Sequence, residues 1–222
     1  MSFVSQKNKK GVFMKKLFSL SVFLLAFISN AQTQPGGMFL KDFGKALGLP
    51  EEFSSQVEIV VGGSAEGAMV MQSRMYVGKA GMRYEMDLPG GFGTITTLAL
   101  NKEGQTKVYM LSPQQKTYSE MPANPRQAHK VDEYTIDDLG EEAVNGIACQ
   151  KKNLTDPKGK VIIVWLKKDE NIPIKCRLEE KGTQVNMFFK NFQAGSVSAK
   201  LLKIPSDYKK GSAMGGFLNF AQ

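Results

Sequence analysis

Methionines at alternate positions are the residues of this chain with the most distinctive chemistry. Met69, Met71 and Met75 share one parity in one stretch, and Met82 and Met86 share one parity in the next. Residues two apart point to the same face of a β-strand, so the two stretches predict a hairpin with its methionines on one face. Thioether sulfur can bind Cu(I), and flexible methionine side chains suit surfaces that adapt to varied apolar partners.

Three interpretations of this face are open at the level of sequence. The methionines can fill an irregular core, line a cavity for a lipid-like ligand, or hold Cu(I). Copper is disfavoured because the sulfurs are spread over two strands, with one histidine in the chain and no cysteine near them. The candidate ligand-binding residues are those that share the face: Met69, Met71, Met75, Met82, Tyr84, Met86 and Leu88.

Motifs for catalysis are weak. His129 is the single histidine and stands in an irregular stretch, 121–131. The glycines of residues 62–67 suggest a phosphate loop, but no Gly-Lys-Ser/Thr follows them. Glu66 stands where a Gly-x-Ser-x-Gly elbow needs its second glycine. We therefore predict a protein that is not an enzyme, has no catalytic residues, and uses no cofactor and no metal.

The elements that position these residues are almost all β-strands from residue 54 onward. Short stretches rich in β-branched and aromatic residues alternate with turn clusters, and such short loops make neighbouring strands antiparallel. Longer connections are expected only at 121–131 and 139–145. The predicted strands are 54–61, 67–77, 81–88, 94–100, 106–111, 115–120, 132–138, 146–154, 160–167, 172–179, 183–192 and 196–203.

Two cysteines, Cys149 and Cys176, fall in predicted strands with another strand, 160–167, between them. In a simple meander two strand spacings of about 4.8 Å would separate them, beyond the roughly 7 Å limit for bridged Cα atoms. We expect two free, buried thiols in preference to a disulfide. The middle strand contains the apolar run Val161 to Trp165, which is typical of a strand covered on both faces.

A helix is expected before the sheet. Phe39, Leu40 and Phe43 are the first of several apolar residues at helical spacing over 38–48, and Gly48 followed by Pro50 is typical of a helix end. The expected organisation is a signal peptide at 1–31, a helical segment at 32–53, a β domain at 54–205 and a Gly-rich apolar tail at 206–222.

Several motifs resemble a known family. They are residues 145–149 (NGIAC), 164–169 (VWLKKD) and 172–175 (IPIK), with residues 109–113 and 116–118 in a hairpin of the same style. The chain resembles the LolA/LolB-like half-barrels of the bacterial envelope and, more narrowly, the secreted domain of unknown function 4412 family, over about residues 54–205. The resemblance implies a mostly β, curved antiparallel sheet of about 11–12 strands, with the N-terminal amphipathic helix covering its concave face and enclosing an apolar cavity. It implies no catalytic residue.

The N-terminal residues indicate export. A basic start at Met14 is followed by a mostly apolar run, Leu17 to Ile28, and by small residues up to Ala31, the pattern of a cleaved signal peptide and too short for a membrane-spanning helix. Residues 1–13 are either a long n-region or a misassigned start. Loss of the five lysines before residue 32 lowers the net charge from +8 to +3, so no nucleic-acid partner is predicted.

The predicted product is a soluble periplasmic or secreted protein without a transmembrane segment. Its expected partner is a hydrophobic small molecule or lipid, held in the methionine-rich cavity without catalysis. The alternative is a structural or interaction protein of the envelope, with a core filled by its own side chains and an envelope protein as its partner. Cu(I) binding through methionine is a distant further alternative.

Overall fold

The computed structural model describes residues 44, 47–62, 68–88, 93–102, 105–121, 134–156, 159–180 and 182–211. The signal region, His129 and most of the predicted helix and tail therefore lie outside the described residues. The strands are β1 (Phe53–Val61), β2 (Met69–Gly78), β3 (Gly81–Asp87), β4 (Thr94–Lys102), β5 (Gln105–Ser112), β6 (Thr117–Met121), β7 (Thr135–Val144), β8 (Ile147–Thr155), β9 (Val161–Lys167), β10 (Ile172–Glu180), β11 (Thr183–Ala194) and β12 (Lys209–Lys210).

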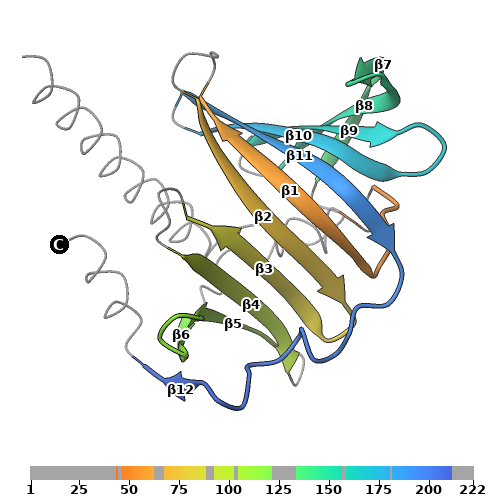
Figure 1. The fold of residues 1–222 in the computed structure, drawn as a ribbon. Helices are drawn as coiled ribbons and strands as arrows, with labels where there is room; N and C mark the ends of the chain where they lie inside the picture. Colours follow the sequence, from red (N-terminus) through yellow and green to blue (C-terminus); the bar gives the residue numbers. More distant parts are fainter. Residues whose placement is uncertain are drawn as a thin grey trace, which may run out of the picture.

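All twelve strands belong to one curved sheet (Figure 1), in the order β12-β6-β5-β4-β3-β2-β1-β11-β10-β9-β8-β7. Strands β1 to β6 run outward from the centre as one meander, and β7 to β11 return to the centre as a second. The two meanders join where β1 pairs antiparallel with β11. Only the short pair of β12 with β6 is parallel. The predicted fold class, a mostly β protein with a curved antiparallel sheet, is confirmed.

The prediction of a longer connection at 139–145 is wrong. Strand β7 continues to Val144 across a register shift between Asp138 and Glu141, where Gly140 has a φ of 86°. The turn is the dipeptide Asn145-Gly146, with φ values of 51° and 79°. Positive φ at both central residues is what a two-residue hairpin turn requires, so this dipeptide closes the β7–β8 hairpin.

The prediction of a strand at 196–203 is also wrong. These residues form turns, with Leu201 N donating to Ser198 O at 2.9 Å. The segment packs on a face of the sheet through Leu202 instead of pairing at an edge. A Cβ on Gly78 would lie 2.8 Å from Leu202 Cδ1, so the absent side chain at Gly78 makes room for this packing. The chain forms a strand again only at β12.

The end of the predicted helix lies within the described residues. Gly44 is helical, Gly48 has a φ of 68°, and Leu49 N donates to Gly44 O at 2.7 Å. This bond between the sixth and first residues of the turn is that of a Schellman motif, so the expected stop at Gly48 is confirmed. Leu47 and Leu49 are buried in the main core, while the rest of 38–48 lies outside the described residues.

Each face of the sheet carries its own clusters of buried side chains. One large cluster includes Val57, Met75, Ile162 and Val185 and extends from β1 to β11 on a single face, which we call the methionine face. The opposite face carries two smaller clusters, one around Leu98 and Leu202 and one around Trp165. Strand β9 contributes to both faces, as its continuous apolar run predicts.

Candidate functional site

Methionine is segregated to one face of the sheet. Eight of the chain's 12 methionines lie in the described ranges, and each of the eight is in, or packed against, the cluster on the methionine face. The two clusters of the opposite face are built from Leu, Tyr, Val, Ile, Cys, Trp and Phe. The eight are Met69, Met71, Met75, Met82, Met86, Met110, Met121 and Met187. Every described methionine therefore lies on the face that carries the main core.

The seven residues singled out from the sequence all lie in this cluster. Met71, Met75, Met82 and Met86 are buried, with between 2% and 6% of their surface exposed. The other three, Met69, Tyr84 and Leu88, are only partly buried and pack against the cluster. The sheet therefore brings all seven together, with four buried and three partly exposed. Of these three, Tyr84 lies between Met75 and Thr97 within the face, with its hydroxyl enclosed.

Sequence reasoning missed three methionines of the same face, Met110, Met121 and Met187. Each lies in or directly beside a strand that the sequence predicts, so the two-residue alternation of that strand gives the side on which its side chain lies. The missing information was the pairing, because Met187 joins the face only through the contact of β11 with β1. Met110 and Met121 join it through the β4–β5 and β5–β6 pairs.

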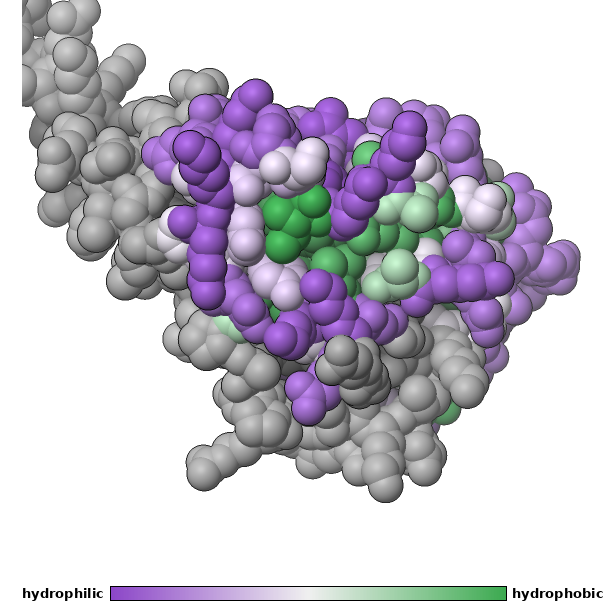
Figure 2. Space-filling view, turned by 90° about the horizontal axis from the view of Figure 1, so that it is seen from below, coloured by the Kyte–Doolittle hydropathy of each residue, from purple (hydrophilic) through white to green (hydrophobic). Residues whose placement is uncertain are grey.

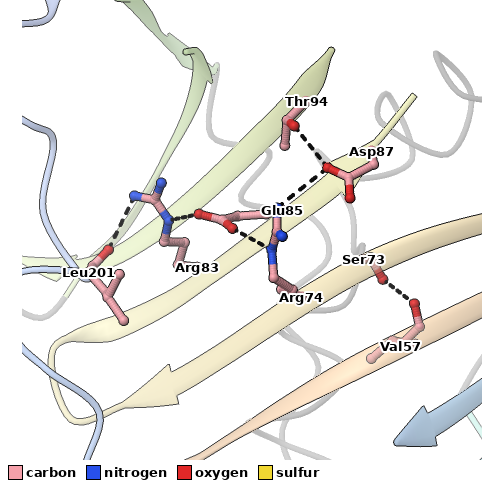
Figure 3. Close-up of polar contacts among 8 residues, drawn as sticks. All are labelled: Val57, Ser73, Arg74, Arg83, Glu85, Asp87, Thr94 and Leu201. Carbon is pink, nitrogen blue, oxygen red and sulfur yellow. Dashed lines mark hydrogen bonds and ion pairs between the residues drawn. The ribbon is translucent and has the colours of Figure 1, made fainter. Parts of the chain in front are cut away.

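A short polar chain crosses this apolar face. The Tyr84 hydroxyl donates to Ser73 Oγ at 3.0 Å, and Ser73 Oγ donates to the Val57 carbonyl at 2.8 Å. Figure 3 shows the second of these bonds. Burial raises the pKa of Tyr84 to about 12, which the hydrogen bond to Ser73 only partly offsets. The tyrosine is therefore neutral at physiological pH and acts as a hydrogen-bonding group within an apolar surface.

The opposite face of the same hairpin is held by an ion-pair network (Figure 3). Glu85 accepts from Arg83 Nε at 2.6 Å and from Arg74 Nε at 2.9 Å, and Arg74 also reaches Asp87 at 3.4 Å. Arg83 donates to the Leu201 carbonyl at 3.4 Å. The network thus fixes the β2–β3 register and attaches the segment after β11 to β3.

That segment covers the cluster around Leu98. Leu202 is buried there, and Val197, Ile204 and Tyr208 pack against the same cluster. In Figure 1 the segment runs along the lower side of the sheet. Leu98 is 0% exposed, so this cluster is covered by the chain's own residues. Seen from below, other apolar residues remain visible at the surface within a rim of hydrophilic ones (Figure 2).

Both cysteines are free, as expected from the strand between them. Cys149 on β8 belongs to the cluster around Trp165, and Cys176 on β10 belongs to the methionine face. The two thiols therefore point to opposite faces of the sheet. Burial raises the pKa of Cys176 to about 12 and also raises that of Cys149.

The described ranges contain no group of three or more His, Cys, Asp or Glu side chains arranged to hold a metal ion. Within the same ranges, no helix is both long enough and apolar enough to cross a membrane.

Comparison with known families gives one match, to the family described as "Domain of unknown function (DUF4412)", over residues 58–171. The chain belongs to this DUF4412 family. The matched range runs from β1 to the turn before β10, so it includes the methionine hairpin and Trp165. The resemblance to this family seen in the sequence is confirmed. No curated protein matches the chain.

Solved structures of low sequence identity are similar to this DUF4412 protein, and one of them, with a TM-score above 0.5, shares its fold. An uncharacterized conserved protein from Thermus thermophilus is 16% identical with a TM-score of 0.53, over 78% of this chain and 96% of that one. A DUF1329 family protein from Desulfovibrio piger is 15% identical with a TM-score of 0.43, over 75% and 95% of the two chains. A LolA superfamily protein from Nitrosomonas europaea is 10% identical with a TM-score of 0.38, over 73% and 96%.

Proposed function

We propose that the methionine face binds an apolar ligand of the lipid or acyl type, without covalent chemistry. The observation that carries the proposal is the one-sided distribution of methionine. A surface that adapts to apolar ligands uses methionine for its flexibility and polarizability, and the described methionines are gathered on one face. The seven residues from Met69 to Leu88 singled out in the sequence are the proposed lining.

Affinity in such a site comes from burial of the ligand. Each methylene removed from water contributes about 0.8 kcal/mol, so a long acyl chain needs no strong polar contact. The partly buried Met69, Tyr84 and Leu88 are where a ligand would first make contact. Rotation of the flexible side chains of Met71 and Met86 would then extend the contact into the layer.

A second candidate is an envelope interaction protein whose core is filled by its own side chains. The burial of Met71, Met75, Met82 and Met86 favours this candidate, as does the packing of Leu47 and Leu49 into the same cluster. In that case a partner protein of the envelope, docked elsewhere on the surface, carries the function.

The site of action that fits both candidates is the periplasm or the outside of the cell. We propose that residues 1–31 are removed on export, leaving a helical segment at 32–53, the β domain and an apolar tail at 206–222. Experiments on binding should therefore use residues 32–222.

Native mass spectrometry of residues 32–222, purified without detergent, tests the proposal. A fatty acid or phospholipid released on denaturation supports ligand binding and gives its class. If the protein is ligand-free and also takes up nothing from palmitate or phospholipid, the self-filled core is correct.

Two neighbouring positions on β2 give a matched pair of variants for a palmitate titration. Met69→Glu places a charge at the margin of the methionine face, whereas Val70→Glu places it on the opposite face, where Val70 is 53% exposed. We expect the first variant to weaken palmitate binding and the second to leave it unchanged. Equal effects would show that the ligand does not bind on the methionine face.

A further inference from the structure

Three cations surround the one tryptophan of the chain, on the face opposite the methionines. Trp165 on β9 lies directly across from Lys151 on β8 and from Lys175 on β10. Lys175 Nζ is 4.6 Å from the ring centroid, Lys151 Nζ is 5.3 Å from it and Arg177 Cζ is 5.6 Å from it. Lys175 Nζ also lies 5.4 Å from the centroid of Phe188. The face opposite the methionines therefore carries a cluster of positive charge around Trp165.

The positive charge of this cluster is only partly neutralised. Glu142 on β7 pairs with Lys151 at 2.6 Å. None of the ion pairs among the described residues includes Lys175 or Arg177. Desolvation, with Arg177 and Lys151 nearby, lowers the pKa of Lys175, although Glu142 acts in the opposite direction. Three cations thus lie around the indole with one carboxylate, Glu142, beside them; on the same face Glu58 pairs with Lys190, and Glu179 lies two residues beyond Arg177 on β10.

Packing of the tryptophan does not by itself account for this arrangement. A cation over an aromatic ring contributes about 0.5–1 kcal/mol at exposed sites, and a single lysine on each side would cover the indole, which is 1% exposed. The third cation, Arg177, adds repulsion with Lys175. A buried amide lies beside it, because Asn186 pairs with Arg177 across β10 and β11, is 8% exposed, and has no hydrogen-bond partner for its side-chain oxygen in the described ranges.

We propose that Lys151, Lys175 and Arg177 form a binding site for one anionic group, a carboxylate or a phosphate, above Trp165. The guanidinium fork of Arg177 suits bidentate contact with either group. The two ammonium groups supply further donors from the flanking strands. Because Lys175 lies over the indole and is partly desolvated by burial, an ion pair made there is stronger than at a fully exposed surface.

This site is separate from the proposed lipid-binding face, so either proposal can fail alone. Its anion can come from a free ion or from an acidic segment of a partner protein, and the chemistry of recognition is the same for both. Ile147 and Val161 lie on the same face, four residues from Lys151 and Trp165 along β8 and β9, and are 37% and 44% exposed, so a bound partner segment could reach one of them by running along the strands. Tighter binding of a peptide than of a free ion would therefore indicate a protein partner.

Trp165 makes the test direct, because the chain has one tryptophan and its fluorescence reports on this site alone. Residues 32–222 are titrated at constant ionic strength with inorganic phosphate and, separately, with a short glutamate-rich peptide, with sodium chloride as the reference. We expect a saturable change in Trp165 fluorescence with at least one of the two probes. A response no different from that of chloride for both probes overturns the proposal.

Variants then assign the response to the cations. Arg177→Gln and Lys175→Gln should each weaken binding by about tenfold or more, as expected for loss of one charged hydrogen bond. Lys203→Gln, at an exposed position outside the cluster, removes the same charge and should leave binding unchanged. Equal weakening by all three variants would show nonspecific attraction and overturn the proposal. If either cluster variant fails to fold, the wild-type titration and the other variant still decide.

Discussion

Tyr84 on β3 donates a hydrogen bond to Ser73 on β2, with 3.0 Å between the two oxygens. Ser73 passes the connection to the backbone of β1 through the Val57 carbonyl. Three adjacent strands are therefore linked by side-chain hydrogen bonds in the middle of an apolar face. Since a buried polar group costs free energy when it has no partner, the two side chains depend on each other.

Removal of the Tyr84 hydroxyl should destabilise the protein modestly. Tyr84→Phe deletes the donor but leaves Ser73 bonded to Val57, so we expect a loss of about 0.5–1.5 kcal/mol in the free energy of unfolding. Denaturant unfolding measures it. Tyr76→Phe, which removes the same atom from the opposite face of β2, is the control, and an equal effect of both would argue against the buried hydrogen bond.

The same tyrosine should make stability fall at alkaline pH. Burial raises the pKa of Tyr84 from 10.0 to about 12, so the folded state retains a proton that the unfolded state loses. The stabilisation is complete below pH 10.0 and is lost as pH rises to about 12. The difference in unfolding free energy between the wild type and Tyr84→Phe should shrink over this window. A difference that stays constant would show that the phenol is not buried.

Acid should weaken the link between β1 and β11. Hydrogen bonds from Lys190 at 2.9 Å and Gln72 at 3.1 Å lower the pKa of Glu58 from 4.5. This contribution is present above pH 4.5 and is lost as pH falls through the lower folded-state pKa. The fall in melting temperature on acidification should therefore be smaller for Glu58→Gln than for the wild type. The control Glu51→Gln, at an exposed position, should show the same fall as the wild type.

A side chain at Gly146 should destabilise the protein through the backbone conformation of the turn and not through a steric clash. Its φ is 79°, and nothing lies within 4 Å of the place that a Cβ would occupy. Gly146→Ala should therefore cost about 1 kcal/mol through the left-handed conformation, measured by denaturant unfolding. Gly44→Ala, at a helical position with room for the methyl group, should instead stabilise, by up to about 1 kcal/mol. The opposite result at Gly146 would mean that the turn rearranges freely.

The two cysteines should remain unreactive in the folded protein. Burial raises the pKa of both thiols, to about 12 for Cys176, and the thiolate is the reactive form. A thiol-labelling reagent should modify neither residue until denaturant is added, and a reductant should not change the unfolding midpoint. Rapid labelling of Cys149 in native protein would show that the β7–β8 end of the sheet opens.

Several features of the site were predictable because they depend on sequence-local geometry. The two-residue period of a strand is enough to place Met71, Met75, Met82 and Met86 on one face. The same period failed at residues 196–203, because Leu202 is held by a face of the sheet and not by a neighbouring strand. The hairpin turn at Asn145-Gly146 was also missed, although Asn-Gly is a recognisable local signal for such a turn.

The cation cluster shows an intermediate case. Lys151, Trp165 and Lys175 are brought together by two successive hairpins, β8–β9 and β9–β10, so the pairing is local in the chain. The register cannot be read from the hairpins alone, because an irregularity between Pro173 and Lys175 sets which side chains of β10 lie opposite Trp165. One residue of slip would move Lys175 to the methionine face.

The sequence alone determined the strand content, the family and the side chains that share a face along each strand, because these follow from local alternation and short motifs. The tertiary structure alone decided that β1 pairs with β11, with Phe53 opposite Ala194. Such a pair leaves no local trace, since it depends on closing a long loop and is stabilised by burial summed over the whole sheet. That pairing joins the two meanders and places Met187 opposite Ile59 of β1, whose other neighbour is Met71 of β2.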